Sequence, residues 1–248
     1  MSKDSSEQFT NPKLVEIYDV FNDLGEDGDF WIAEVKRLAP KTIIDLGCGT
    51  GLLTCDLAEK GYEMTGVEPA APMLEVARRK PYAEKVKWIA GGYEKFEGLK
   101  ADLVLLTSHV AQFFYEDSEW NKMLAASCKA LNPGGHILFD SRQHLEKSFE
   151  TWPTDASRRR KEDPAYGPIE WWCKLLDTDD KYARYELHYL FLNTGEEVVS
   201  TDRLVFRTEA ELRNSLEGAG FSIEKVYGDW DGSPLTEASP EMLFLASR

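Results

Sequence analysis

The 248-residue sequence has few of the residues that build metal centres or disulfide frameworks. It contains four cysteines and four histidines. The cysteines, Cys48, Cys55, Cys128 and Cys173, have no spacing typical of a metal site. We therefore expect reduced thiols in a cytoplasmic protein, and no metal site.

Long apolar runs are also missing. The longest lie around residues 103–106 and 242–246 and are far shorter than the roughly 20 residues that a membrane-spanning helix needs. The first residues are polar and acidic, unlike a secretory signal peptide. The sequence therefore predicts no membrane partner.

Positive charge is scarce relative to negative charge. The chain has 29 Lys and Arg against 44 Asp and Glu, a formal net charge of −15. A phosphate backbone must be met by a basic surface, and the one short basic run, Arg158–Lys161, is a weak footprint. We therefore expect no nucleic-acid partner.

The most informative pattern lies at residues 42–53. Thr42–Leu46 is typical of a buried strand, and a turn with Gly47, Gly49 and Gly51 follows it before a helix begins. Glycine permits positive backbone angles and a close approach of a ligand. The spacing is not the G-x-G-x-x-G of dinucleotide sites, and Asp45 at the strand tip suits an ammonium group better than a phosphate. S-adenosyl-L-methionine carries such an ammonium and no phosphate.

The run Asp45-Leu-Gly47-Cys-Gly49-Thr-Gly51 resembles the first motif of the class I S-adenosylmethionine-dependent methyltransferases. The resemblance implies an α/β fold with a Rossmann-like seven-stranded sheet in the order 3-2-1-4-5-7-6, flanked by helices, with its last strand antiparallel. It also implies direct methyl transfer from S-adenosyl-L-methionine to a small-molecule acceptor, with S-adenosyl-L-homocysteine as the product. Glu68-Pro69 closes the expected second strand, where an acid accepts the ribose hydroxyls.

The adenine site departs from the family pattern. Gly92 stands where the family often has Asp, so the adenine amino group must be held by Glu94, by backbone carbonyls or by packing against Tyr93 and Met73. Tyr18 is a candidate for the cofactor carboxylate, and core packing explains Tyr18 and Met73 equally well. The expected cofactor contacts are Tyr18, Asp45, Gly47, Gly49, Thr50, Gly51, Leu52, Glu68, Pro69, Met73, Gly92, Tyr93, Glu94, Ser108 and His109.

On the acceptor side we expect His109, Gln112 and Arg142. In the resembled family the tip of the fourth strand, here residues 101–107, lies beside the sulfonium and the acceptor. Histidine titrates near neutral pH and suits a general base, although a structural histidine is the commoner case. Arg142 could bind an anionic acceptor, and the alternative is that it forms an ordinary surface ion pair. Because the sulfonium makes the methyl group electrophilic, alignment alone can suffice.

The sequence divides into a core at 41–142 and 207–248, an N-terminal helical cover at 1–40, and an insertion at 143–206. Residues 12–21 and 29–38 are expected to be the helices of the cover. The insertion predicts antiparallel strands at 169–176, 182–192 and 197–206, with a helix or loop from Thr151 to Lys161. Three roles of the insertion stay open: a lid over the cleft, a homodimer surface or an extension of the core.

Three other functions remain open at this level. A protein methyltransferase has the same core and differs in a groove for a peptide. A non-catalytic cofactor-binding protein keeps the glycine turn. A nicotinamide-dependent reductase has a similar strand and glycine turn, but the chain lacks a convincing Tyr-x-x-x-Lys pair.

Overall fold

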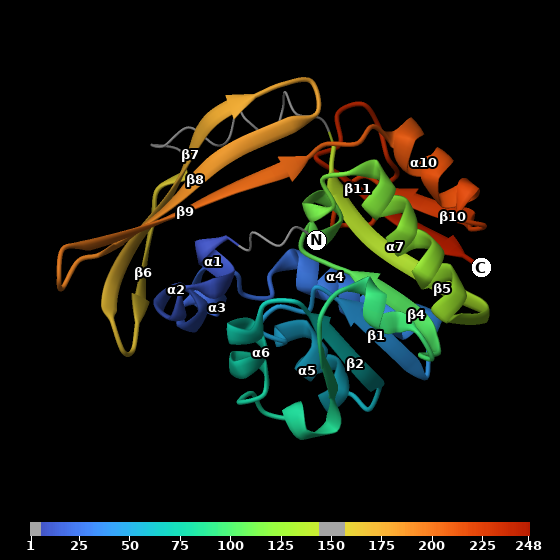
Figure 1. Cartoon of the computed structure of the whole chain (residues 1–248), viewed down its shortest axis with the longest axis horizontal. Helices are drawn as coiled ribbons and strands as arrows, with labels where there is room; N and C mark the ends of the chain where they lie inside the picture. The colour runs from blue at the N-terminus through green and yellow to red at the C-terminus, as the bar shows by residue number, and fades with distance from the viewer. Residues whose placement is uncertain (1–5, 144–156) are drawn as a thin grey trace.

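The computed structural model of the protein describes residues 6–143 and 157–248. These residues form two sheets, and short N-terminal helices lie between them (Figure 1). The larger sheet has the order β10-β11-β5-β4-β1-β2-β3, and the smaller has the order β6-β7-β8-β9. The strands of the larger sheet are β1 (Thr42–Leu46), β2 (Glu63–Glu68), β3 (Lys87–Ala90), β4 (Ala101–Leu106), β5 (Leu131–Arg142), β10 (Ser222–Tyr227) and β11 (Glu241–Ser247).

The larger sheet has the predicted topology. Strands β1 to β5 run parallel, and β11 is inserted antiparallel between β5 and β10. This is the order 3-2-1-4-5-7-6, so the expected fold class is confirmed. The carboxyl ends of β1, β2, β4 and β5 therefore share one edge with the first residue of β11, and open α/β sheets bind ligands at that edge.

Helices cover both faces of this sheet. On one face α4 and α5 bury Trp31 and Leu57, and on the other α7 and α10 bury Trp120 and Leu216. Because β4 is buried from both sides, its sequence is a nearly continuous apolar run. The helical segments around the sheet are α4 (Glu26–Leu38), α5 (Leu52–Glu59), α6 (Ala71–Ala77), η1 (Ala83–Lys85), η2 (Tyr93–Phe96), η3 (Val110–Phe113), α7 (Asp117–Ala130) and α10 (Glu209–Gly218).

The smaller sheet is an antiparallel ribbon, drawn in yellow and orange in Figure 1. Three of its strands were expected, but the segment Arg159–Asp163 is a strand and not the predicted helix or loop. This strand is polar throughout and lies at the edge of the sheet. Its sequence therefore shows no alternation of apolar and polar residues, and only its pairing with β7 identifies it as a strand. Residues 151–156 lie outside the described part of the chain. The strands are β6 (Arg159–Asp163), β7 (Gly167–Thr178), β8 (Tyr182–Phe191) and β9 (Glu196–Val205).

Three short helices join the two sheets. The helix expected at 12–21 is interrupted at Ile17, whose backbone leaves the helical region while its side chain is fully buried. Leu14 and Ile17 pack against the smaller sheet, whereas Val15 packs against Met73 of α6. No helix of the described residues is long and apolar enough to cross a membrane. The three helices are α1 (Glu7–Thr10), α2 (Pro12–Glu16) and α3 (Tyr18–Phe21).

Candidate active site

Two glycines of the turn after β1 are required by the protein's own packing. Gly47 and Gly51 have φ angles of 78° and 74°, which side-chain-bearing residues rarely adopt. A Cβ atom at Gly47 would lie 2.6 Å from Cγ2 of Val110, and one at Gly51 would lie 2.6 Å from Cη2 of Trp88. These glycines therefore let Val110 of η3 and Trp88 of β3 pack closely against the turn.

Gly49 differs because it borders open space. Its φ angle is 54°, and the nearest atom to an added Cβ would be Cε of Met73 at 3.7 Å. Its backbone N–H donates to Oε2 of Glu68 over 3.1 Å. The turn thus offers a cradle that any side chain at position 49 would partly fill.

The Glu68 carboxylate is held at the tip of β2 by backbone groups. It accepts hydrogen bonds from Gly49 N and from Ala70 N, the latter over 2.8 Å, and the residue is 5% exposed. Burial raises its pKa to about 7, against the opposing effect of these two hydrogen bonds. Each carboxylate oxygen keeps a further lone pair that suits a ribose hydroxyl.

Asp45 presents a buried oxygen without a partner. Its Oδ2 accepts from Thr54 Oγ1 over 2.6 Å, whereas its Oδ1 has no hydrogen-bond partner among residues 6–143 and 157–248. The residue is 1% exposed, and burial raises its pKa to about 6. A buried oxygen that lacks a donor fits a cationic group.

The N-terminal helices reach the glycine turn through polar contacts. Thr50 Oγ1 donates to the carboxylate of Asp19 on α3, which also pairs with Lys80. Tyr18 is half-buried beside this turn, and burial first, then nearby groups including Glu68, raise its pKa well above the ordinary value. The structure thus brings Tyr18, Thr50 and Glu68 to the same turn, and their contacts with the cofactor stay predictions.

The residues expected around the adenine have other contacts. The hydroxyl of Tyr93 donates to Glu119 Oε2 over 2.7 Å, and its ring packs against the core beneath α7. Glu94 is exposed and accepts from Gly92 N over 2.9 Å. Their adenine contacts stay predictions, as do the cofactor contacts of Leu52, Pro69 and Ser108.

The tip of β4 carries a histidine bound by two carboxylates. Ser108 and His109 both have positive φ angles, 54° and 63°, a conformation that costs about 1–2 kcal/mol per residue. This turn directs His109 N to Asp140 Oδ2 at 2.8 Å. The imidazole Nε2 lies 3.0 and 3.1 Å from the two carboxylate oxygens of Glu241, 3.3 Å from Asp140 Oδ2, and the ring meets Trp230 edge-on.

Sequence reasoning did not select Glu241 for this site. It is the first residue of β11, and only the antiparallel insertion of β11 beside β5 brings it to the ligand-binding edge. The imidazole nitrogen of His109 and carboxylate oxygens of Asp140 and Glu241, which could serve as metal ligands, lie within 4.8 Å of one another. Hydrogen bonds from the shared imidazole nitrogen account for this spacing without an ion.

Gln112 and Arg142 form hydrogen bonds that connect the elements next to the histidine. The Gln112 amide donates to Val205 O over 3.0 Å and accepts from Arg142 Nη1 over 3.2 Å. Gln112 is buried, and these contacts join η3, β5 and β9. Both ends of its amide are engaged within the protein, so Gln112 links these elements, and its contact with the acceptor stays a prediction.

Known proteins are similar to this chain in architecture and in sequence. A family model described as a methyltransferase domain matches residues 43–135. An uncharacterized methyltransferase from Geobacillus kaustophilus is 30% identical over 153 residues, which cover 60% of this chain and 69% of that protein. The chain belongs to the class I S-adenosylmethionine-dependent methyltransferases.

Two further likenesses extend over almost the whole methyltransferase. The cypemycin N-terminal methyltransferase from Streptomyces sp is 26% identical over 247 residues, covering 94% of this chain and 95% of that protein. The crystal structure of an S-adenosylmethionine-dependent methyltransferase from Clostridium acetobutylicum has a TM-score of 0.76 at 17% identity, covering 96% and 98% of the two chains. The second sheet is therefore part of a fold seen elsewhere.

The residues of the methyltransferase fit its cofactor. Asp45 has an unpaired buried oxygen for the ammonium, Glu68 has an acceptor carboxylate for the ribose, and Gly49 borders open space. When bound, S-adenosyl-L-methionine supplies an electrophilic methyl group. The individual contacts remain predictions.

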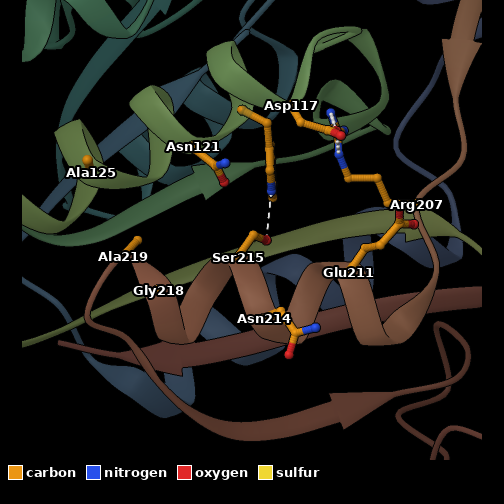
Figure 2. A pocket seen from close by; sticks show the side chains of 10 residues that line it. Asp117, Asn121, Ala125, Arg207, Glu211, Asn214, Ser215, Gly218 and Ala219 are labelled. Carbon is orange, nitrogen blue, oxygen red and sulfur yellow. Dashed lines mark hydrogen bonds and ion pairs between the residues drawn. The ribbon is translucent and has the colours of Figure 1, made fainter.

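A separate cavity lies between two helices of the methyltransferase. Figure 2 shows it between α7 and α10, where Trp120 Nε1 donates to Ser215 Oγ over 2.9 Å and Arg207 pairs with Asp117. None of its lining residues belongs to the glycine turn or to the histidine cluster. We assign it no part in the reaction.

Proposed function

We propose that this methyltransferase acts on an amine nitrogen of a small-molecule acceptor. The observation that carries the proposal is the His109 imidazole bound by Asp140 and Glu241 at the tip of β4. Amines are largely cationic near neutral pH, and two carboxylates favour a cation. An ammonium must lose a proton before its nitrogen can attack, and a histidine side chain is suited to accept it.

The names of several relatives support a nitrogen acceptor. Besides the cypemycin N-terminal methyltransferase, a glycine/sarcosine N-methyltransferase from Halorhodospira halochloris is 27% identical over 131 residues. The sugar N-methyltransferase KedS8 from Streptoalloteichus sp shares the fold with a TM-score of 0.72 at 20% identity. These acceptors differ in size but share an amine.

The chain's own groups have distinct tasks in this proposal. Asp45 and Glu68 bind and orient the cofactor, and the glycine turn lets the backbone approach it. His109 takes the proton from the acceptor. Helices α1 to α3 limit the access of water, which keeps the charges in a region of low dielectric.

The test is an assay of S-adenosyl-L-homocysteine release with paired acceptors. Glycine and glucosamine are paired with glycolate and glucose, which carry a hydroxyl in place of the amine, and sarcosine is added as a secondary amine. We expect release with at least one amine, a methylated nitrogen by mass spectrometry, and a fall of about a hundredfold in His109→Gln. Methylation of a hydroxyl in preference to every amine contradicts the proposal.

A peptide N-terminus is the second candidate. It is supported by the cypemycin N-terminal methyltransferase, which aligns with 94% of this chain. The same assay with a short peptide and its N-acetylated form separates the two candidates. Turnover of the free peptide, with none of the small amines, favours the peptide.

A further inference from the structure

The imidazole of His109 has two nitrogens in different surroundings. Nε2 faces the carboxylates of Glu241, at 3.0 and 3.1 Å, and of Asp140, at 3.3 Å. No group within residues 6–143 and 157–248 makes a hydrogen bond with Nδ1. The two nitrogens are therefore not interchangeable.

We infer that Glu241 and Asp140 hold His109 in its Nε2-protonated form, so that Nδ1 is the nitrogen that takes the acceptor's proton. The second half of this inference rests on the proposed function. An ionised carboxylate only accepts hydrogen bonds, so Nε2 must be the donor to Glu241. Nδ1 then keeps its lone pair.

The backbone supports the same orientation. The two successive left-handed residues at 108 and 109 are strained, and strain of this kind persists where the surroundings fix it. Here Asp140 binds both the backbone N–H and the side chain of His109. Asp140 and Glu241 are thus positioning residues, contributed by β5 and by β11.

The proton transfer balances with the methyl transfer. An N–H bond of the acceptor ammonium breaks, its proton goes to Nδ1, and its electron pair becomes the nitrogen lone pair. That lone pair forms the new N–C bond while the electrons of the S–C bond return to the sulfur. The charged groups facing the resulting imidazolium are Asp140 and Glu241, and the positive charge of Arg142 interacts with Asp140.

The experiment is two-bond ¹⁵N–¹H correlation spectroscopy of the ¹⁵N-labelled full chain near pH 7.5, which reports the protonated ring nitrogen of each histidine. The His109→Gln variant identifies the signals of His109. We expect a protonated Nε2 and an unprotonated Nδ1 in the wild-type protein. In Glu241→Gln we expect the fraction with a protonated Nδ1 to rise several-fold. In turnover, this variant lowers kcat and leaves the KM for S-adenosyl-L-methionine unchanged.

A matched control is Glu224→Gln, because Glu224 of β10 faces Nε2 of His136 at 3.3 Å, and His136 pairs with Ser247 at the opposite end of β11 from Glu241. It should alter the signals of His136 and leave those of His109 unchanged. A protonated Nδ1 in the wild-type protein, or an unchanged equilibrium in Glu241→Gln, overturns the inference. The spectra need no acceptor, so the tautomer can fail while amines are methylated, or hold while they are not.

Discussion

At the residue scale, the cofactor site depends on carboxylates kept out of water. Asp45 and Glu68 come from adjacent parallel strands, yet Asp45 has an oxygen without a partner, whereas each oxygen of Glu68 accepts one backbone N–H and keeps a further lone pair. The first arrangement is suited to bind a cation, and the second to hold a carboxylate in a fixed orientation. The two acids therefore have separate roles.

Replacing Glu68 with alanine should weaken S-adenosyl-L-homocysteine binding by about tenfold to a hundredfold, because hydrogen bonds to a charged group contribute about 1.5–3 kcal/mol. Glu63→Ala is the control, since Glu63 lies on the same strand and is exposed. Isothermal titration calorimetry measures both. Equal affinity in the two variants would remove Glu68 from the ribose site.

Gly49→Val should abolish S-adenosyl-L-homocysteine binding, because the new side chain enters the open space beside Met73. It also strains the backbone by about 1–2 kcal/mol. Gly98→Val isolates the strain, since Gly98 has a φ angle of 78° and nothing within 4 Å of an added Cβ. If both variants bind like the wild-type protein, the cradle at Gly49 is not the cofactor site.

At the scale of elements, α1 to α3 join the second sheet to the core. Gln8 on α1 donates to Asp202 of β9 over 2.9 Å, and Asp19 on α3 binds the glycine turn. Ile17 between α2 and α3 is 0% exposed within the core of the smaller sheet. The hydrogen bonds and packing of these helices therefore link the cofactor site to the insertion.

Ile17→Ala should lower the free energy of unfolding by about 2–5 kcal/mol, the usual effect of truncating a fully buried aliphatic side chain. Leu24→Ala provides the comparison, because Leu24 is 38% exposed, and its effect should stay within about 0.5 kcal/mol. Urea denaturation monitored by tryptophan fluorescence determines both values. Similar losses in the two variants would mean that the N-terminal helices are not anchored as described.

The elements that the sequence predicted well carry local signals. The glycine turn follows an apolar strand directly, and the strands at 182–192 and 197–206 alternate around a turn with Gly195. β6 lacked such a signal because its residues are polar and its pairing partner defines it. Glu241 was missed for a related reason, since its place beside His109 depends on strands about a hundred residues apart.

At the scale of the whole molecule, the net negative charge and the buried acids both lower the stability of the folded protein as pH rises. The formal net charge is −15, and burial raises the pKa of Asp45, Asp140 and Asp202 to about 6 and that of Glu68 to about 7. Their ordinary values are 3.8 for aspartate and 4.5 for glutamate. The folded state thus binds more protons than the unfolded state between about pH 4 and pH 7.

Stability of the ligand-free protein should therefore fall as pH rises through this range. The carboxylates with lowered pKa values, such as Asp102, act mainly below about pH 4 and do not reverse the trend. We expect a higher Tm near pH 5.5 than near pH 8 in scanning fluorimetry at constant ionic strength. A higher Tm near pH 8 would show that these acids ionise freely in the folded protein.

The central claim, that the turn after β1 and the tip of β2 bind S-adenosyl-L-methionine, is tested most directly by calorimetric titration. The purified protein is titrated with S-adenosyl-L-homocysteine and, for comparison, with NADH. We predict one site per chain for S-adenosyl-L-homocysteine, lost in Gly49→Val and weakened in Glu68→Ala, and no binding of NADH. Preference for NADH, or affinity for S-adenosyl-L-homocysteine that neither substitution changes, would contradict this account.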